Sequence, residues 1–294
     1  MQQTWLIYGG NGWIGSKLVK ELEKFQNVTI VLGQARCGIS SDLEHEIELF
    51  KPDRVLSFIG RTCGPSTSDH LGTVNTTIDY LEQPGKIYDN MRDNFFSPIL
   101  LERICSFKNI HFTYLGTGCI FYTKRGESKV YHETDEPNFF GSKYSVVKGM
   151  TDTYMRHNSK VTLNVRIRMP ISDEEHPKNL LCKLRKYQKI TDCGENSMTV
   201  FSDLLPVLIK MVIDGKTGTI HLVNPGPMKH SEIAQLYKEI VDPNFSYELM
   251  TEEDQSGILQ AGRSTCVLSS EEMQSYGVPN LRDSIVRIFS SWRV

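Results

Sequence analysis

The segment YLGTGCIF, residues 114–121, carries a hydroxyl and a thiol two positions apart, Thr117 and Cys119. The segment is typical of a buried strand that ends in a loop. In an extended chain, residues i and i+2 point to the same side. The two side chains could therefore be small packing residues, or both could face a substrate.

A second pair of candidate residues lies four positions apart in YSVVK, namely Tyr144 and Lys148. The spacing puts both on one face of the helix predicted over 142–157. A neighbouring ammonium favours the phenolate of a buried tyrosine, so Tyr144 could exchange a proton with a carbonyl or alcohol oxygen. With Thr117 as a second donor, these groups are typical of ketone reduction. Since such a pair is also a common structural feature, its context decides the interpretation.

The context is a phosphate-binding pattern near the start of the chain, GGNGWIG. It follows a predicted strand and opens a predicted helix, as a dinucleotide-binding fingerprint requires. Its residues, expected to contact the cofactor, are Gly9, Gly10, Asn11, Gly12, Trp13, Ile14 and Gly15. The second strand ends in VLGQARC, which lacks an acidic residue for the ribose hydroxyls. Arg36 could pair with a 2′-phosphate, which favours NADPH over NADH.

These residues need a scaffold, and strands alternate with helices through the first part of the chain. Strands are predicted at 4–10, 27–33, 53–60, 111–118 and 161–168, and helices at 13–25, 41–51, 86–107 and 142–157. This alternation predicts an α/β fold, a Rossmann-type doubly wound parallel sheet. Residues 61–86 are polar and predict a long functional loop.

The pattern changes after Pro170. Helices are predicted at 178–187, 202–213, 230–241 and 269–277, with a strand at 219–226. We therefore predict a dinucleotide-binding domain over 1–170. A smaller substrate-binding region over 171–294 is expected to interleave with it.

The bulk composition excludes several classes of function. The chain has 294 residues and a net charge of -2, which predicts no affinity for nucleic acid or a membrane surface. No apolar run is long enough to span a bilayer, and the first residues lack the features of a signal peptide. The seven scattered cysteines fit neither a disulfide framework nor a metal site, so we expect a reducing, cytoplasmic compartment.

Taken together, the motifs resemble the extended short-chain dehydrogenase/reductases that act on nucleotide sugars, over essentially the whole chain. More narrowly, TGCIF, PNFFGSKYSVVKG, RIRMP, NSMTVFSDLLP and TIHLVNPG are similar to the nucleotide-rhamnose synthases. These are bifunctional 3,5-epimerase/4-reductases for nucleotide-linked 4-keto-6-deoxyglucose, related to dTDP-4-dehydrorhamnose reductase and GDP-fucose synthase. The resemblance implies a UDP or dTDP sugar, NADPH, a homodimer, and a separate upstream 4,6-dehydratase that supplies the substrate.

The resemblance also implies roles for individual residues. Thr117 and Tyr144 would stabilise the O4 enolate, and Cys119 would be the epimerase base. Lys183, in HPKNLLCKL, would be the acid, with His176 as the alternative. Further contacts are expected from Gly60, Arg61 and Thr62 for the cofactor, and from Asn94, Met198, Thr199 and Arg263 for the substrate. Of Arg166 and Arg168, one is expected to face the site.

Two other functions compete with this one. A reductase alone would leave Cys119 and Lys183 inert and would need a separate epimerase. A non-catalytic, NADP-binding regulatory subunit could use the same fold. The first alternative predicts loss of the cysteine or its partner, and the second predicts damage to the Thr–Tyr–Lys set. All of these residues are present in the chain.

Overall fold

The computed structural model describes residues 2–36, 38–65, 74–75, 77–158 and 160–292. Their contacts divide the chain into two compact units that interleave along the sequence. The first unit comprises Met1–Thr117, Ser142–Arg166 and Leu205–Ile220, and the second comprises Gly118–Gly141, Ile167–Leu204 and His221–Val294. The domain boundary expected at residue 170 remains a prediction.

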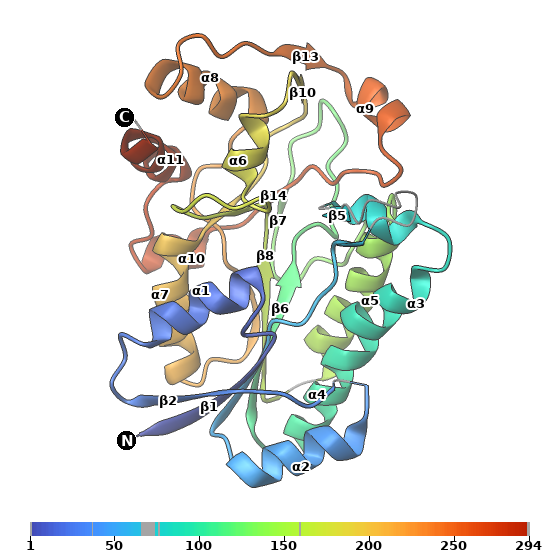
Figure 1. The fold of residues 1–294 in the computed structure, drawn as a ribbon, viewed down its shortest axis with the longest axis vertical. Coiled ribbons are helices and arrows are strands. Elements are labelled where there is room, and N and C mark those ends of the chain that lie inside the picture. The colour runs from blue at the N-terminus through green and yellow to red at the C-terminus, as the bar shows by residue number, and fades with distance from the viewer. Residues whose placement is uncertain (1, 37, 66–73, 76, 159, 293–294) are drawn as a thin grey trace. The chain divides into compact units, whose positions relative to one another are not determined.

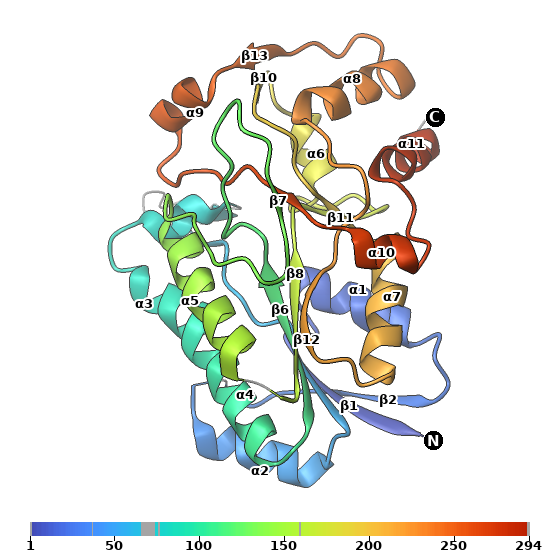
Figure 2. The same ribbon diagram turned by 180° about the vertical axis from the view of Figure 1, so that it is seen from behind.

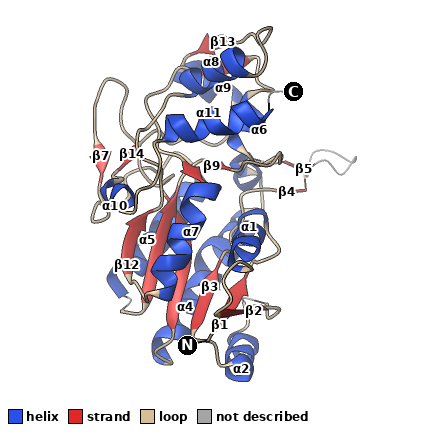
Figure 3. Cartoon of the chain, turned by 90° about the vertical axis from the view of Figure 1, so that its left-hand side faces the viewer, coloured by secondary structure: helices blue, strands red, loops and turns tan. Residues whose placement is uncertain are grey.

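The first unit is built on a six-stranded sheet with the order β12-β8-β6-β3-β1-β2 (Figure 3). Its strands are β1 (Gln3–Tyr8), β2 (Val28–Leu32), β3 (Arg54–Ser57), β6 (His111–Thr117), β8 (Thr162–Ile167) and β12 (Gly218–His221). The pairs β2–β1, β1–β3 and β3–β6 are parallel. Trp5, Leu6 and Ile7 are fully buried, as expected for a strand covered on both faces.

Helices cover both faces of this sheet, which confirms the predicted doubly wound fold. On one face lie α1 (Trp13–Leu22) and, from Leu205 onward, α7 (Phe201–Ile213) (Figures 1 and 3). On the other lie α2 (Ser40–Phe50), α4 (Ser97–Phe107) and α5 (Lys143–Asn158). Helices α4 and α5 run side by side in both ribbon views (Figure 2).

The segment predicted as one helix over 86–107 is divided in three. It consists of α3 (Ile87–Met91), the π-helix η2 (Arg92–Phe96) and α4. The preceding segment, predicted as a long loop, also contains the short strands β4 (Gly64–Pro65) and β5 (Val74–Asn75) and the 3-10 helix η1 (Ile78–Glu82). Residues 66–73 and 76 of that loop lie outside the described residues.

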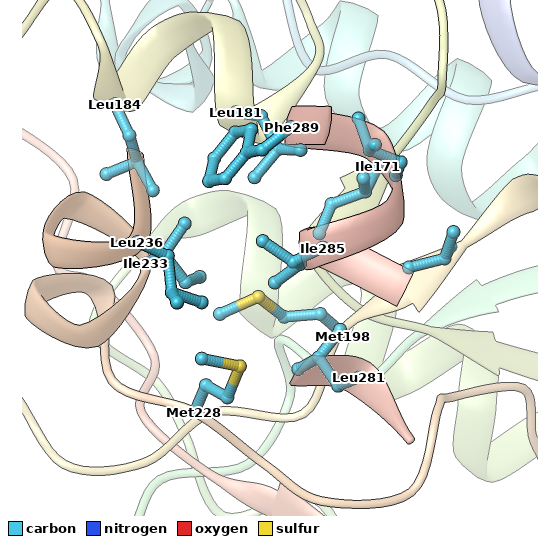
Figure 4. Packing of buried hydrophobic residues seen from close by; sticks show 12 residues of the cluster. Ile171, Leu181, Leu184, Met198, Met228, Ile233, Leu236, Leu281, Ile285 and Phe289 are labelled. Carbon is cyan, nitrogen blue, oxygen red and sulfur yellow. The ribbon is translucent and has the colours of Figure 1, made fainter. Parts of the chain in front are cut away.

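The second unit has its own apolar core between α6 (Leu180–Leu184), α8 (His230–Ile240) and α11 (Leu281–Trp292). Figure 4 shows side chains from these helices, including Leu181, Ile233 and Ile285, pointing toward one another. The helix α11 was not predicted, although Leu281, Ile285, Ile288 and Phe289 repeat with helical spacing and are buried.

Short elements complete the second unit. They are β7 (Val130–Tyr131), β9 (Pro170–Ile171), β10 (Lys189–Thr191), β11 (Thr199–Val200), β13 (Glu248–Met250), β14 (Val267–Leu268), α9 (Glu252–Ile258) and α10 (Glu271–Ser275). The strand predicted at 219–226 is shorter and ends at His221.

Candidate active site

The loop after β1 has a geometry that only glycine can adopt at two positions. Gly9 has a φ of 76°, and a Cβ there would lie 2.8 Å from the carbonyl carbon of Phe58. A Cβ at Gly15 would lie 2.2 Å from the carbonyl oxygen of Gly9. The amide of Gly12 donates to that same oxygen at 3.0 Å, which closes the turn. Asn11 and Gly12 are the exposed residues of this loop.

Helix α1 begins directly after this loop. Its N-cap residue Gly12 is extended, with φ −73° and ψ 166°, and offers no side chain to cap the first amides. The first N–H groups of a helix have no acceptor inside the helix, and its N-terminal end carries a partial positive charge. The first turn, opened by Trp13 and Ile14, contains no acidic residue. This arrangement suits a pyrophosphate, so the residues present fit a dinucleotide cofactor.

A carboxylate that sequence analysis missed shapes the end of β2. Glu46 of α2 is buried and accepts hydrogen bonds from the amides of Gln34, at 2.7 Å, and Ala35, at 3.1 Å. Both of its oxygens therefore bind backbone groups. The next residue, Arg36, is exposed. No local pattern could have revealed Glu46, because it comes from the following helix.

The segment after β3 is held by Asn94, which lies in the π-helix η2. Its Oδ1 accepts from the Arg61 amide at 3.0 Å, and its Nδ2 donates to the Arg61 carbonyl at 2.9 Å. A Cβ at Gly60 would lie 3.3 Å from the same Oδ1. Asn94 is 1% exposed, so the structure places it as a clamp on the backbone beside Gly60, Arg61 and Thr62. Its contact with substrate stays a prediction.

The side chain of Arg61 is itself fixed. Its Nε donates to Asp93 at 2.5 Å. Burial raises the pKa of Asp93, but hydrogen bonds from Arg92 and Arg61 outweigh it, so the net shift is downward.

The Tyr144–Lys148 pair lies on α5 and faces β6. Lys148 is 4% exposed, and its ammonium donates to the hydroxyl of Tyr114 at 2.6 Å and to the carbonyl of Leu115 at 3.2 Å. Burial raises the pKa of Tyr114 well above its usual value, and the neighbouring Tyr144 adds to this effect. Lys148 therefore joins the helix to the strand that ends at Thr117. Sequence analysis assigned no role to Tyr114, although it precedes Thr117 by three residues.

The structure corrects one argument about Thr117 and Cys119. Thr117 is buried and is the last residue of β6, whereas the strand was expected to continue through Gly118. Cys119 lies in a turn, closed by a hydrogen bond of 3.2 Å from the Phe121 amide to the Gly118 carbonyl. The alternation of a strand therefore does not extend to Cys119. The strand stops because the chain turns after Gly118.

In the second unit, the half-exposed thiol of Cys119 is contacted by a buried cation. Nη1 of Arg168 donates to Cys119 Sγ at 3.4 Å and to Ser264 Oγ at 2.8 Å. Nη2 donates to Asn196 Oδ1 and to the Ser264 carbonyl at 2.6 Å. No role in the site was predicted for Asn196 or Ser264, although Asn196 begins the motif NSMTVFSDLLP.

The two candidates for the epimerase acid lie close in sequence. Lys183 is on α6, which Asn179 caps by accepting from the Leu181 amide at 3.2 Å. Lys183 and His176 are both half-buried. The ring nitrogen Nδ1 of His176 accepts from the Lys178 amide at 3.1 Å. The roles of Lys183 and His176 stay predictions.

The remaining predicted substrate residues differ in their surroundings. Met198 is fully buried in the core of the second unit (Figure 4). The hydroxyl of Thr199 donates to the Leu222 carbonyl at 2.6 Å and accepts from the Arg168 amide at 3.0 Å. Arg263 is half-buried and donates to the Ala261 carbonyl at 2.8 Å. Met198 and Thr199 thus stabilise the fold, and their substrate contacts remain predictions.

Three observations bear on other kinds of site. Across the described part of the chain, no helix is both long and apolar enough to cross a membrane. Among the same residues, no group of His, Cys, Asp and Glu side chains could hold a metal ion. A cavity of about 460 Å³ lies at the amino ends of β3 and β6 and contains none of the predicted residues. Ligands of parallel sheets bind instead at the carboxyl ends of the strands.

Comparisons with known proteins agree with this geometry. The profile of the NAD dependent epimerase/dehydratase family matches residues 5–172. The chain is 44% identical to the L780 UDP-rhamnose synthase of Acanthamoeba polyphaga mimivirus, whose crystal structure superposes with a TM-score of 0.91 over 99% of each chain.

Two further proteins are similar to the chain. It is 33% identical to the Arabidopsis thaliana bifunctional dTDP-4-dehydrorhamnose 3,5-epimerase/dTDP-4-dehydrorhamnose reductase, over 92% of this chain and 87% of the relative. The dTDP-4-dehydrorhamnose reductase of Bacillus anthracis, solved in complex with NADP, shares the fold, with a TM-score of 0.79 at 16% identity over 99% and 100% of the two chains.

Proposed function

Because this chain belongs to the NAD dependent epimerase/dehydratase family, we propose that it is a bifunctional 3,5-epimerase/4-reductase. It converts a nucleotide-linked 4-keto-6-deoxy-D-glucose to a nucleotide-linked L-rhamnose. The observation that carries this proposal concerns Cys119, which lies two residues after Thr117. This residue is half-buried, and the buried guanidinium of Arg168 contacts its thiol. In a reductase without epimerase activity, this thiol would be inert.

Epimerisation needs a base and an acid. The thiolate of Cys119 takes the proton from C3 or C5, which the C4 ketone acidifies, and the electron pair moves to O4. Thr117 and Tyr144 donate hydrogen bonds to this enolate oxygen. Lys183 returns a proton to the opposite face of the carbon. Solvent then takes the proton from Cys119 and returns one to Lys183. The epimerisation therefore neither consumes nor releases a proton overall.

Reduction follows at C4. NADPH, when bound, supplies the hydride. The Tyr144 phenol donates its proton to O4 as the alcohol forms. Lys148 lies four residues further along α5, and its ammonium favours the ionised form of Tyr144.

The choice of nucleotide and cofactor follows from two observations. L780, named for a UDP sugar, is 44% identical to this chain, whereas the relative named for a dTDP sugar is 33% identical. We therefore favour UDP. Arg36 is exposed after β2, and both oxygens of Glu46, the carboxylate at the end of this strand, accept backbone hydrogen bonds. This favours NADPH over NADH.

The proposal includes partners and a location. A 4-keto-6-deoxy sugar is a dehydration product, so a 4,6-dehydratase must precede this enzyme. We propose a cytoplasmic homodimer. Exposed apolar side chains on the helices α3, η2 and α5, such as Ile87, Phe96 and Met150, support the association of two copies. Light scattering should then give twice the monomer mass of 33.5 kDa.

One reaction tests the function. The purified protein is mixed with NADPH and UDP-4-keto-6-deoxyglucose, without another enzyme. Cofactor absorbance and product stereochemistry, by proton NMR, are followed together. We expect NADPH to be consumed and UDP-L-rhamnose to form. Oxidation that begins only after a separate epimerase is added would show a reductase alone. No oxidation with either the UDP or the dTDP substrate would favour the regulatory role.

The substitution Cys119→Ser separates the two activities. A serine hydroxyl is a far weaker base than a thiolate, so deuterium uptake from heavy water at C3 and C5 should disappear. Reduction of an already epimerised 4-keto-rhamnose should continue. Cys63→Ser, at another half-exposed thiol, is the control and should retain both activities. If the Cys119 variant still exchanges C3 and C5 protons, Cys119 is not the base.

A further inference from the structure

The guanidinium of Arg168 is buried without a carboxylate partner among the described residues. The residue is 1% exposed, and the acceptors of its hydrogen bonds are Asn196 Oδ1, the Oγ and carbonyl oxygen of Ser264, and Cys119 Sγ. The oxygen acceptors are all neutral. Burying a cation is costly unless an anion compensates its charge.

Arg166, two residues earlier, shows the usual solution to the same problem. It is fully buried, and the carboxylate of Asp152 accepts from its Nε at 2.8 Å and its Nη2 at 2.7 Å. Arg168 has an equally buried guanidinium but contacts a sulfur in place of the carboxylate. Among the acceptors of Arg168, the Cys119 sulfur is the one that can become an anion.

Other titratable groups near Arg168 do not supply that charge. Burial raises the pKa of Cys266 to about 11. Burial also raises the pKa of Cys193, and the negative charge of Glu252 raises it further. Both thiols therefore stay protonated at neutral pH, although Arg168 opposes both shifts. Burial and the charge of Arg168 lower the pKa of His230 to about 4, so this ring stays neutral.

The backbone fixes Arg168 beside Cys119. The amide of Gly118 donates to the Ile167 carbonyl at 2.8 Å, and the amide of Arg168 donates to Thr199 Oγ1 at 3.0 Å. The following residue, Met169, has a φ of 41°, a left-handed conformation that a side chain rarely adopts. Such strain persists where the surroundings impose it, often at functional sites.

We infer that Arg168 is a positioning residue that orients the sulfur of Cys119 and stabilises its thiolate when this forms, while Asn196 and Ser264 orient the guanidinium. This deepens the proposed function and rests on it in one respect, that the thiolate is the epimerase base. The thiolate itself can be measured without substrate, so the two ideas fail separately.

The test is the rate of Cys119 alkylation at pH 7 in the full chain. Iodoacetamide reacts with the thiolate, and mass spectrometry of the Cys119 peptide gives the rate. In Arg168→Met the rate should fall about tenfold, because the thiolate loses the cation that stabilises it. A rate in Arg168→Met equal to that of the wild type would overturn the inference.

A second variant keeps the guanidinium and places a negative charge beside it. Asn196→Asp puts a carboxylate of nearly the same shape on Arg168, at the loss of the amide that donates to the Gly194 carbonyl at 3.0 Å. The carboxylate should partly neutralise Arg168 and slow the alkylation of Cys119 as well. This variant carries the test if Arg168→Met fails to fold. Ser197→Ala is the control, because Ser197 is buried in the same segment and bonds the Leu268 carbonyl and amide, not Arg168. An alkylation rate in Asn196→Asp equal to that of the control would contradict the inference.

Deuterium exchange at C3 and C5 then separates the two ideas. If alkylation slows in both variants but the wild type shows no exchange, the inference about Arg168 is supported and the proposed function is contradicted. If the wild type shows exchange but alkylation is unchanged in both variants, the proposed function is supported and the inference about Arg168 is contradicted.

Discussion

At the scale of single residues, the proposed mechanism makes reduction depend on the phenol of Tyr144. Tyr144→Phe removes the proton donor and leaves the ring in place, so turnover should fall by about 10²- to 10⁴-fold. NADPH oxidation with an already epimerised substrate measures this. Tyr88→Phe removes the same hydroxyl from a side chain that is 70% exposed, and it should leave the rate unchanged. Equal rates in both variants would exclude Tyr144 as the proton donor.

His230 makes stability depend on pH. Its ring contacts Met169 Sδ at 3.3 Å, and its pKa falls from 6.5 to about 4 through burial and the charge of Arg168. Between these values the unfolded chain binds a proton that the folded protein does not. Stability should therefore fall as pH drops from 6.5 to about 4. Urea unfolding should show a weaker pH dependence in His230→Gln, and identical slopes would contradict the assignment.

At the scale of elements, the turn into α1 depends on the absence of side chains. Gly15→Ala would place a Cβ 2.2 Å from the Gly9 carbonyl oxygen, so loop or helix must shift. Such overpacking costs about 1–3 kcal/mol, and NADPH affinity should fall with it. Urea unfolding and NADPH fluorescence titration measure the two effects.

The matched control for this substitution lies in α9. A Cβ at Gly257 meets nothing within 4 Å, and alanine is favoured over glycine in a helix by about 0.5–1 kcal/mol. Gly257→Ala should therefore be at least as stable as the wild type and bind NADPH equally well. If both variants lose NADPH to the same extent, the tight turn is not the cause.

At the scale of the whole molecule, the preference for one cofactor should appear as a higher thermal stability of the protein with that cofactor bound. A ligand that binds the folded state stabilises it by about 2.7 kcal/mol at one hundred times its Kd. NADPH should therefore raise Tm more than NADH at equal concentration, because Arg36 can pair with the 2′-phosphate. In Arg36→Ala the two cofactors should have the same effect. A larger shift with NADH in the wild type would contradict the preference for NADPH.

Local sequence patterns were enough to predict the doubly wound sheet, the glycine loop with its helix, and the Tyr144–Lys148 spacing on one helix. Each depends on residues close together in the chain, so spacing and residue type are enough to predict it. The same applies to α11, whose apolar spacing was present in the sequence. The family resemblance rested on motifs of this local kind.

The contacts between residues far apart in the chain are known only from the folded structure. Arg168 contacts Cys119, 49 positions away, and Ser264, 96 positions away, and Lys148 reaches Tyr114 across 34 positions. Met198, expected near substrate, is buried in an apolar core. No local period encodes such contacts, because they depend on how elements far apart in the chain pack together. The partner of a buried charge is therefore found only once the chain is folded.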